Sequence, residues 1–240
     1  MDVYIITGAS KGIGFELSKQ LQFMGKKVIG VARTSPKSTE NFVTINLADT
    51  SQLHKLIANL ISGNRKEATS FTLINNAGMV DPIGLIGGVE ANGIAEAIAV
   101  NLTAPMILSN AFIAELENFI GAKRIVNISS GAGRNAYEGW GTYCTTKAGL
   151  DHFSRVVALE QEKVQYPVEI VSIAPGIIDT GMQETIRASD EDAFPLLNQF
   201  IHYKEQGLLS SAEQTAKKLI GFMENEDFKL VGPIADIRNY

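Results

Sequence analysis

Short apolar runs alternate along the chain with longer segments in which apolar residues recur at helical spacing. The apolar runs lie at residues 3–7, 27–32, 42–46, 71–75, 124–128, 168–173 and 230–235. The helix-period segments lie at residues 12–24, 50–62, 93–118, 142–163 and 211–225. Apolar strands that alternate with helices indicate a parallel sheet that is covered on both faces. The pattern therefore predicts one α/β domain, residues 1–240, built on about seven parallel strands.

Two segments depart from this alternation. Residues 33–41 join the second predicted strand to the third, and they are fewer than the dozen or so of a usual parallel crossover, so we expect a loop or a single turn. Residues 183–207 follow a strand and mix acidic with aromatic side chains. They form either a lid over a pocket or surface helices with an apolar underside. We favour the lid, because α/β sheets bind ligands at the carboxyl ends of their strands.

Composition and charge exclude several classes of function. Hydrophobic residues make up 45% and charged residues 20% of the chain, as in ordinary soluble proteins, and the formal net charge is −5. This balance argues against a nucleic-acid or anionic-membrane partner. The one cysteine, Cys144, cannot form an internal disulfide, and the three histidines lack the spacing of metal ligands. We see no secretion signal and no apolar run approaching the roughly 18 residues of a membrane span, so we expect a cytoplasmic protein without a metal.

The glycine-rich stretch TGASKGIG, residues 7–14, follows the first predicted strand directly and opens the first predicted helix. Glycines at positions 8, 12 and 14 permit a tight turn and a close approach of the backbone to a pyrophosphate. The free N–H groups and the positive dipole end of the helix then favour that anion. The stretch therefore predicts a dinucleotide site.

Charges near the second strand indicate which dinucleotide binds. An NAD site needs an acidic residue about 20 residues after the glycines, but residues 17–39 contain neither Asp nor Glu. Instead, Arg33 follows the second strand and Lys11 lies in the glycine turn. Two cations without an acid suit a 2′-phosphate, so we predict NADP(H) as the cofactor.

The stretch GWGTYCTTKAG, residues 139–149, places Tyr143 four residues before Lys147. On a helix this spacing puts both side chains on one face. The pair is either a catalytic acid beside the cation that tunes it or two aligned surface residues. Reduction of a ketone needs a proton for the developing alkoxide, and a nearby ammonium lowers the pKa of a phenol from its usual value of about 10. We expect Lys147 to act in this way on Tyr143, the general acid of the reduction.

Six motifs, in order along the chain, give this sequence a resemblance to the short-chain dehydrogenase/reductase family over essentially its whole length. They are TGASKGIG at 7–14, NNAG at 75–78, Asn101 in VNLTAP, ISSGAG at 128–133, YCTTK at 143–147 and PGIIDT at 175–180. The resemblance implies a Rossmann-type, doubly wound parallel sheet with helices on both faces. It also implies a nicotinamide dinucleotide as cofactor, which the charges above identify as NADP(H), and a small-molecule carbonyl compound as substrate.

The resemblance implies roles for single residues in catalysis. Ser130 lies thirteen residues before Tyr143, and on that spacing we choose it over Ser129 as the hydroxyl that hydrogen-bonds the substrate carbonyl. Lys147 matches the lysine that also binds the nicotinamide ribose. Asn101 matches the asparagine that holds a water in a proton relay; alternatively, it is an amide that joins two helices or marks a helix kink.

The resemblance also implies a set of cofactor contacts. Besides Tyr143 and Lys147, these are Gly8, Ser10, Lys11, Gly12, Ile13, Gly14, Arg33, Asn46, Leu47, Asn76, Ala77, Gly78, Pro175, Gly176, Ile178 and Thr180. Thr180 would hold the carboxamide and so orient the nicotinamide ring. Asn46 departs from the family pattern, in which an aspartate usually lies at the adenine, although an amide can also contact the base.

A narrower resemblance concerns the substrate. The stretches GWGTYCTTKAGLDHF, APGIIDTGMQ and GPIADI are similar to the sepiapterin reductase branch and, still more, to bacterial benzil reductases. Both groups act on a carbonyl within a 1,2-dicarbonyl unit. Asp236 aligns with an aspartate that anchors a pterin; otherwise it is a polar residue that closes the last strand. Trp140 either forms an aromatic wall of the substrate pocket or packs beneath the loop.

The leading hypothesis is an NADPH-dependent reductase of 1,2-dicarbonyls or aryl ketones. Reduction of a pterin side chain or of a 3-oxoacyl thioester remains an alternative, although the latter would need a basic patch for an acidic carrier protein. A regulatory protein that senses NADP without catalysis is the alternative from another class. The family resemblance further implies a homodimer or homotetramer, assembled through the helices that carry Asn101 and Tyr143.

Overall fold

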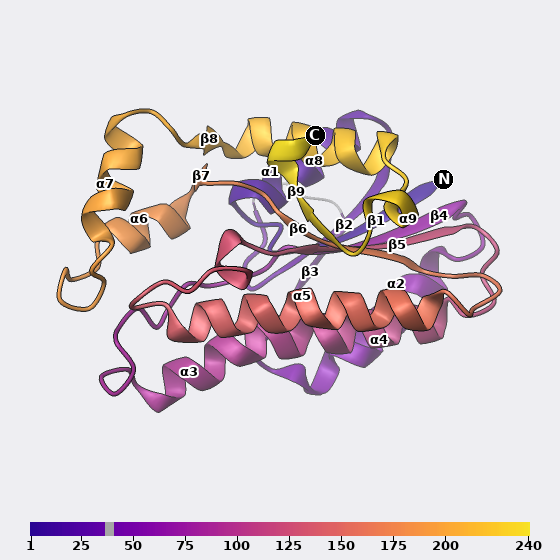
Figure 1. Cartoon of the computed structure of the whole chain (residues 1–240). Coiled ribbons are helices and arrows are strands. Elements are labelled where there is room, and N and C mark those ends of the chain that lie inside the picture. Colours follow the sequence, from indigo (N-terminus) through magenta and orange to yellow (C-terminus); the bar gives the residue numbers. More distant parts are fainter. Residues whose placement is uncertain (37–40) are drawn as a thin grey trace.

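The computed structural model describes residues 1–36 and 41–240, and within them one parallel sheet of seven strands forms the centre of the molecule (Figure 1). In spatial order the strands are β3 (Phe42–Thr44), β2 (Lys27–Ala32), β1 (Asp2–Thr7), β4 (Ser70–Asn75), β5 (Ala122–Ile128), β6 (Glu169–Ala174) and β9 (Ile234–Asp236). The chain order reverses between β1 and β4, which opens a crevice at their carboxyl ends. The predicted doubly wound α/β fold is confirmed.

Helices cover both faces of this sheet (Figure 1). On one face lie α1 (Gly12–Phe23), α8 (Ala212–Asn225) and α9 (Phe228–Val231); on the other lie α2 (Leu53–Asn64), α3 (Ala91–Ile98), α4 (Ala104–Glu115) and α5 (Gly141–Gln161). Alternate residues of β1 point into two separate cores. Val3 and Ile5 pack towards α2, α4 and α5, whereas Tyr4 and Ile6 pack towards α1 and α8. Burial on both faces explains why the strands read as continuous apolar runs.

The helix-period segment predicted at residues 93–118 forms one long apolar helix with a widened turn in its middle. A π-helical turn, Ala99–Thr103, joins α3 to α4. Contrary to the expectation from the sequence, Ala91–Glu115 is long and apolar enough to cross a membrane, with a mean hydropathy of 1.6. Here its side chains, among them Leu108 and Phe112, pack in the core against the sheet. Burial against its neighbours thus accounts for part of this apolar surface, since 44% of the most apolar window is buried.

The prediction of a strand at residues 230–235 is wrong for its first residues, which belong to a helix. The side chain of Asp227 accepts a hydrogen bond from the Lys229 amide and caps α9, which ends at Val231. Gly232 then turns the chain with a φ of 80°, and β9 begins only at Ile234. Apolar Leu230 and Val231 belong to the helix because local capping overrides their strand-like pattern. The crossover expected at residues 33–41 is irregular over 33–36, and its residues 37–40 lie outside the described part of the chain.

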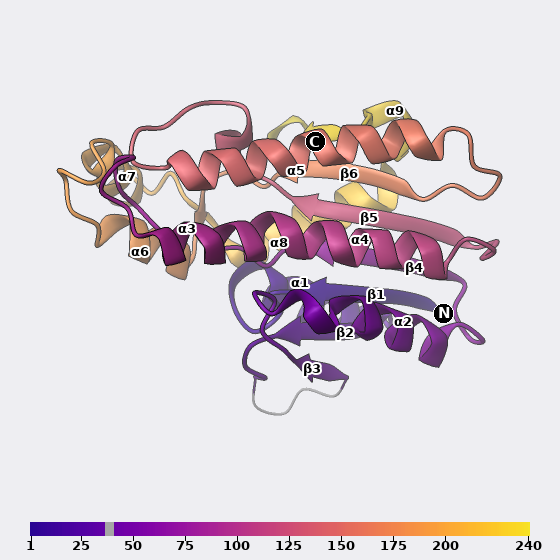
Figure 2. The same cartoon turned by 90° about the horizontal axis from the view of Figure 1, so that it is seen from below.

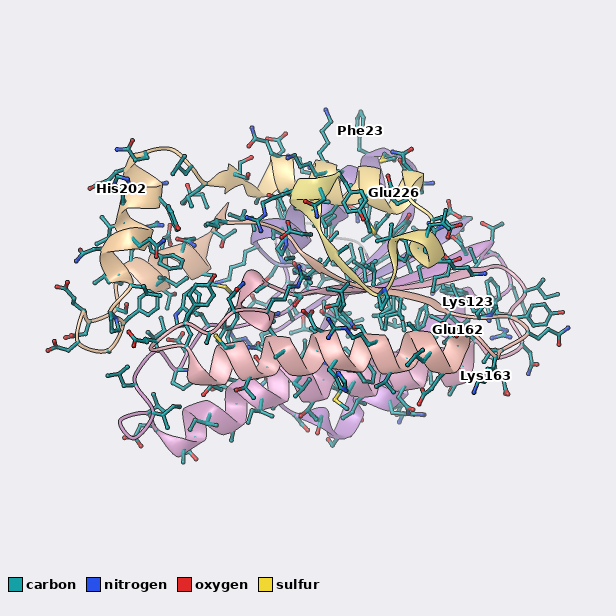
Figure 3. The ribbon with its side chains drawn as sticks, in the orientation of Figure 1. Phe23, Lys123, Glu162, Lys163, His202 and Glu226 are labelled. Atoms are coloured by element: carbon teal, nitrogen blue, oxygen red, sulfur yellow. The ribbon has the colours of Figure 1, made fainter. Side chains whose placement is uncertain are left out.

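The segment predicted as a lid contains two helices beyond the carboxyl ends of the strands. These are α6 (Gly181–Arg187) and α7 (Leu197–Glu205), and Figure 2 shows them beside the amino-terminal ends of α3 and α5. A short parallel pair, β7 (Ile178–Asp179) and β8 (Ser210–Ser211), connects them to the rest of the fold. His202 marks this end of the molecule in Figure 3, and Lys123 marks the opposite end.

Candidate active site

Tyr143 and Lys147 lie on the first two turns of α5, on the face that packs against the sheet. Both side chains are buried, and the Lys147 Nζ lies 5.8 Å from the centroid of the Tyr143 ring. The i, i+4 spacing therefore does bring the phenol and the ammonium together on one helix face. Of the two interpretations of the spacing, an aligned pair on the outer surface is wrong.

Ser130 reaches Tyr143 from the end of β5. Its side chain accepts a hydrogen bond from the Ala132 amide, 3.1 Å away, and so caps the single 3₁₀ turn Gly131–Gly133. The Ser130 side chain also lies near enough to the Tyr143 phenol to lower its pKa. The neighbouring Ser129 hydroxyl is buried and has no hydrogen-bond partner among the described residues. The structure thus brings Ser130, not Ser129, to the phenol.

The environment of Tyr143 changes the expected direction of its pKa. Burial raises the pKa of Tyr143 to about 12, and the nearby Ser130 side chain acts in the opposite direction. This outcome is contrary to the lowering that the helix spacing predicts, because removal of the phenolate from water outweighs the stabilisation by its neighbours. At neutral pH the phenol therefore keeps its proton.

Lys147 is held by the strand that leads to Ser130. Its Nζ donates a hydrogen bond of 2.8 Å to the carbonyl oxygen of Ile128, the last residue of β5. Burial lowers the pKa of Lys147 to about 8, and the negative charge of Asp151 opposes that shift. The side chain is thus still mostly an ammonium at neutral pH, although it lies almost entirely away from water.

Asn101 lies in the π-helical turn between α3 and α4, beside Lys147. Its Oδ1 accepts from the Met79 amide at 2.9 Å, and its Nδ2 donates to the Met79 carbonyl at 2.8 Å and to Thr146 Oγ1 at 3.3 Å. A Cβ added at Gly78 would lie 3.5 Å from Asn101 Oδ1 and 3.6 Å from Lys147 Nζ. The amide joins the long helix to α5, as one of its two interpretations requires, and also lies near Lys147. π-Helical turns are frequent at functional sites.

The glycine turn packs tightly against the loop after β4. Gly8 has a φ of 68°, and a Cβ added there would lie 2.8 Å from Asn76 Nδ2 and 2.9 Å from the Cα of Ala77. A Cβ at Gly14 would lie 2.4 Å from the Gly8 carbonyl oxygen. The Asn76 side chain fixes this approach by donating to the carbonyl oxygen of Thr7 at 2.9 Å. Both positions therefore require glycine.

The amino terminus of α1 is open to an anion. Lys11 occupies the N-cap position with an extended backbone and makes no side-chain cap. The first amides of the helix, at Gly12, Ile13 and Gly14, thus have no capping side chain as an acceptor, which leaves them available to a phosphate. Ser10 lies in the same turn and is half-buried. These residues fit the pyrophosphate of a dinucleotide.

The loop after β6 faces this turn. A Cβ added at Gly12 would lie 3.5 Å from Thr180 Cγ2, and one added at Gly181 would lie 3.8 Å from Lys11 Nζ. Thr180 is the N-cap residue of α6. Pro175, Gly176 and Ile178 lead to it from β6, Gly176 with a φ of 86°. The predicted contacts from two distant motifs therefore lie next to each other in the structure.

The predicted adenosine contacts lie at the carboxyl ends of β2 and β3. Arg33 directly follows β2 and is exposed, so its guanidinium is accessible to an anion in solution. Asn46 is also exposed, and its Oδ1 accepts from the Ala48 amide at 3.1 Å. Leu47 is buried in the core beneath them. The Nδ2 of Asn46 makes no side-chain hydrogen bond within the described residues, so this amide is available as a donor.

Trp140 lies at the centre of an aromatic cluster that joins α5 to the α6–α7 segment. Its ring stacks on Phe194, with centroids 4.9 Å apart, and meets Tyr143 edge-on at 5.5 Å and Phe200 at 5.1 Å. Its Nε1 is buried without a hydrogen-bond partner among the described residues. Trp140 therefore packs under the segment and also contacts the catalytic phenol. Sequence reasoning missed the stacking role of Phe194, although aromatic residues in 183–207 signalled an apolar underside.

Asp236 ends β9 with both carboxylate oxygens already occupied. Oδ1 accepts from Arg238 Nε at 2.8 Å and Oδ2 accepts from Arg238 Nη2 at 2.6 Å, and these bonds lower the pKa of Asp236. Arg134 Nη1 lies 3.9 Å from Oδ2. An anchoring role towards a substrate would require Asp236 to exchange one of these bonds, so the arrangement agrees better with a residue that closes the last strand.

One charged residue beside the site was not recognised from the sequence. Asp151 lies one helical turn after Lys147 and is buried. Its signal in the sequence is the repeat of the i, i+4 spacing that relates Tyr143 to Lys147. Within residues 1–36 and 41–240, no group of three or more His, Cys, Asp or Glu side chains could hold a metal ion.

Comparison with known proteins gives matches that extend far beyond the glycine turn. The family model of the short chain dehydrogenases matches residues 2–191. A benzil reductase ((S)-benzoin forming) of Bacillus cereus is 39% identical in an alignment of 239 positions that covers 95% of this chain and 96% of that protein. The sepiapterin reductase of Mus musculus is 28% identical over 95% of this chain and 93% of its own. The crystal structure of a short chain dehydrogenase/reductase from Saccharomyces cerevisiae is 25% identical, with a TM-score of 0.83 over 99% of this chain and 96% of its own.

Proposed function

The chain belongs to the short-chain dehydrogenase family, and within it we propose an NADPH-dependent reductase that delivers hydride to one ketone of a 1,2-dicarbonyl or aryl ketone. That the protein is an oxidoreductase acting on CH–OH or C=O groups follows from its family. The observation that carries the finer proposal is the meeting of Ser130, Tyr143 and Lys147 at the carboxyl end of β5.

The residues of the crevice fit a nicotinamide dinucleotide with a 2′-phosphate. The uncapped amides at the start of α1 would hold the pyrophosphate, and exposed Arg33 would pair with the 2′-phosphate. Lys147 and Thr180 would hold the nicotinamide half. When bound, NADPH supplies the hydride. No acidic residue lies in 17–36 to compete with the phosphate, which supports NADPH over NADH.

Tyr143 serves as the acid. Its pKa of about 12 keeps the phenol protonated across the physiological range, so a proton is held at Oη for the alkoxide oxygen that develops on the substrate. Ser130, close to the same phenol, would donate to that oxygen as well and stabilise its charge. The Lys147 ammonium adds a positive charge nearby.

Resupply of the proton is assigned to Lys147 and Asn101. The Lys147 ammonium has a pKa of about 8 and so exchanges protons readily near neutral pH. Asn101 lies on the other side of Gly78 from Lys147, and its amide is fixed by Met79. We assign Asn101 the positioning of a water that connects the lysine to solvent.

The preference for a dicarbonyl is supported by the benzil reductase of Bacillus cereus, which shares 39% of its residues with this chain. The aromatic cluster around Trp140 gives the same support, because Trp140, Phe194 and Phe200 place apolar rings beside the Tyr143 phenol. A sepiapterin side chain is the second candidate, on the 28% identity to the Mus musculus enzyme. The pairing of Asp236 with Arg238 argues against it.

The α6–α7 segment is proposed as the lid of this site. Asp179, directly before Thr180, accepts a hydrogen bond from Lys204 on α7, and Arg187 Nη2 on α6 lies 3.9 Å from its Oδ1. These exposed ion pairs are weak, so the segment can open, while Phe194 and Phe200 dock it against Trp140. Lys204→Ala is expected to loosen the closed state and raise the KM for the ketone more than it lowers kcat.

A homodimer or homotetramer is proposed through the outer faces of α4 and α5. Met106 on α4 and Val156 and Leu159 on α5 are exposed apolar side chains on these two neighbouring helices. Pairing of such faces about a two-fold axis would bury them. Light scattering after size-exclusion chromatography measures the number of subunits, and Leu159→Glu should reduce it.

The proposed activity is tested by following NADPH oxidation with benzil, a small aliphatic diketone and sepiapterin in turn. Tyr143→Phe should lose turnover while retaining NADPH binding, and Tyr166→Phe, at the opposite end of the sheet, is the matched control. A preference for sepiapterin would move the enzyme to pterin reduction. Tight NADPH binding without turnover of any carbonyl would contradict the reductase and favour the NADP-sensing protein.

The cofactor is tested separately by comparing NADPH with NADH in wild type and Arg33→Ala. Loss of the guanidinium should weaken NADPH binding and leave NADH binding unchanged, because only NADPH carries the 2′-phosphate. Arg155→Ala, an exposed arginine on α5, is the control. Equal weakening of both cofactors would contradict the assignment of Arg33 to the 2′-phosphate.

A further inference from the structure

Asp151 continues the catalytic face of α5 into the interior. It lies two turns after Tyr143 and one turn after Lys147, and only 2% of its surface is exposed. A carboxylate buried to this extent needs partners that compensate for lost hydration. Its two partners come from two other parts of the fold, β6 and the turn after β5, and this distribution is the starting point of the inference.

Each carboxylate oxygen of Asp151 has its own partner. Oδ1 accepts a hydrogen bond of 2.6 Å from Ser172 Oγ on β6. Oδ2 accepts one of 3.3 Å from the Nε of Arg134, directly after the turn that Ser130 caps. Arg134 in turn donates from Nη2 to the Ala235 carbonyl on β9, at 2.7 Å. Asp151 therefore connects α5, two strands and the Ser130 turn.

The Ser130 turn lies in direct contact with α5 at this point. A Cβ added at Gly133 would lie 2.9 Å from the Lys147 carbonyl oxygen and 3.1 Å from Asp151 Oδ2. Only a residue without a side chain permits this approach. The turn therefore packs closely against Lys147 and Asp151 of α5. The ion pair between Arg134 and Asp151 holds it in this position.

The charges around Lys147 are few. From α5 the titratable groups are Tyr143 and Asp151; from β5 and the loop after β4 the neighbours are the neutral Ile128 carbonyl and Gly78. The neutral Asn101 faces Lys147 from the long helix. Behind Asp151 stand Arg134 and then the Asp236–Arg238 pair. Within the described chain, Asp151 is the anion whose field acts on the ammonium.

We propose that Asp151 is a positioning residue of the active site, which keeps Lys147 in its ammonium form and, through Arg134, holds the Ser130 turn against α5. This inference rests on the proposed function only in the roles of Lys147 and Ser130. Arg134 opposes the first of these two roles of Asp151, because its own positive charge weakens the stabilisation of the Lys147 ammonium by Asp151. The two side chains therefore have opposite effects on the ammonium although they form one pair.

The test is a pH titration of the Lys147 side chain in the full-length protein labelled with ¹³C at lysine Cε. The Lys147 signal is identified by its loss in Lys147→Met. In Asp151→Asn the titration midpoint should fall by about one pH unit or more, because burial is then unopposed. In Arg134→Gln the midpoint should rise. Asp227→Asn, at the α9 cap, is the matched control and should leave the midpoint unchanged.

Opposite shifts in the two variants support the proposal, because a purely structural role would move both midpoints in the same direction or neither. An unchanged midpoint in Asp151→Asn would overturn it. If Asp151→Asn does not fold by circular dichroism, Arg134→Gln decides: a rise supports the proposal, and no rise overturns it.

Activity gives a second readout once a carbonyl substrate is turned over. The alkaline limb of the kcat/KM profile should move to lower pH in Asp151→Asn and to higher pH in Arg134→Gln, because Lys147 acts as the ammonium. A wild-type protein that reduces no carbonyl compound contradicts the proposed function, whereas the lysine titration decides the role of Asp151 independently.

Discussion

Two buried lysines lie at the two ends of β5, and they resemble each other in most respects. Lys123 is near the start of the strand and Lys147 contacts its last residue; 3% and 4% of their respective surfaces are exposed. Figure 3 labels Lys123 at the end of the molecule opposite the α6–α7 segment. Each ammonium donates to backbone carbonyls, and burial lowers the pKa of each.

The two ammonium groups differ in the number of hydrogen bonds they make and in the charges beside them. Lys123 donates to two carbonyl oxygens, those of Leu116 at 3.0 Å and Tyr166 at 2.5 Å, and the nearby cation Arg65 lowers its pKa further. Lys147 donates to one carbonyl, has the anion Asp151 behind it and faces Gly78, where no side chain occupies the space. Burial of an ammonium therefore does not by itself indicate a role in catalysis. The unused donors of Lys147 and its compensating anion are the features that support the role proposed for it.

The largest expected effect comes from removing each ammonium in turn. Lys147→Met should lower the rate of ketone reduction by about 10²- to 10⁴-fold, since it removes a charge that supports the acid Tyr143. Lys123→Met should leave that rate within about twofold of wild type. NADPH oxidation with the best dicarbonyl substrate measures both variants. Comparable losses in the two would remove the distinction between the ends of β5.

Stability should respond in the opposite order. Lys123→Met removes the two hydrogen bonds to the Leu116 and Tyr166 carbonyls, which should lower the free energy of unfolding by about 2 kcal/mol. Lys147→Met leaves one carbonyl without a donor and should cost less. Urea denaturation followed by circular dichroism compares the two. A Lys123→Met protein as stable as wild type would mean that water replaces the lost donor.

A third difference is expected in the dependence of stability on pH. The pKa of Lys147 is about 8 when folded against an ordinary 10.5, so the unfolded chain binds more protons between these values. Stability contributed by this group therefore rises with pH in that window. Between about pH 8.5 and about pH 9.5, wild type should gain about 1 kcal/mol relative to Lys147→Met. Equal slopes would show that Lys147 titrates normally.

The smallest expected effect concerns Asp2, at the amino end of the sheet. Hydrogen bonds from Lys26 and Ser70 lower the pKa of Asp2 to about 2. Its stabilisation is complete above pH 4 or so and disappears as the pH falls towards 2, and partial exposure keeps it below about 1 kcal/mol. Asp2→Asn should lose this amount in urea denaturation at neutral pH and nothing near pH 2. Turnover should be unchanged in Asp2→Asn. A change would mean that the amino end of the sheet influences the active site.

The fold could be predicted from the sequence wherever burial on both faces made a strand uniformly apolar, as in β1 and β4. The prediction failed where local contacts decide. Leu230 and Val231 read as a strand but belong to α9, because the Asp227 cap and Gly232 fix a helix there. No continuous apolar run reveals the long helix Ala91–Glu115 as long and apolar enough for a membrane span, because polar residues interrupt it although its mean hydropathy is 1.6.

The site was predictable to the extent that spacing determines it. One helix brings Tyr143 and Lys147 together, and a family motif selected Ser130. The direction of the Tyr143 pKa was wrong, because spacing reveals a neighbouring charge but not the removal of water. The partners of Asp151 come from residues 134 and 172, so no local pattern could reveal them. Arg238, only two residues beyond Asp236, donates hydrogen bonds to the carboxylate for which the sequence had suggested contact with the substrate as one of two roles.

The stacking of Trp140 against Phe194 has an optical consequence. Trp140 is the only tryptophan of the 240 residues, so the intrinsic fluorescence of the protein at long excitation wavelengths arises from a single indole beside the catalytic phenol. Reduced nicotinamide absorbs in the range where indole emits, so energy transfer from Trp140 would quench its emission when NADPH binds. Separation of Phe194 from the indole would shift the same emission by a different amount. The emission of this one native chromophore would therefore report both the binding of the cofactor and a displacement of the α6–α7 segment, without an added label.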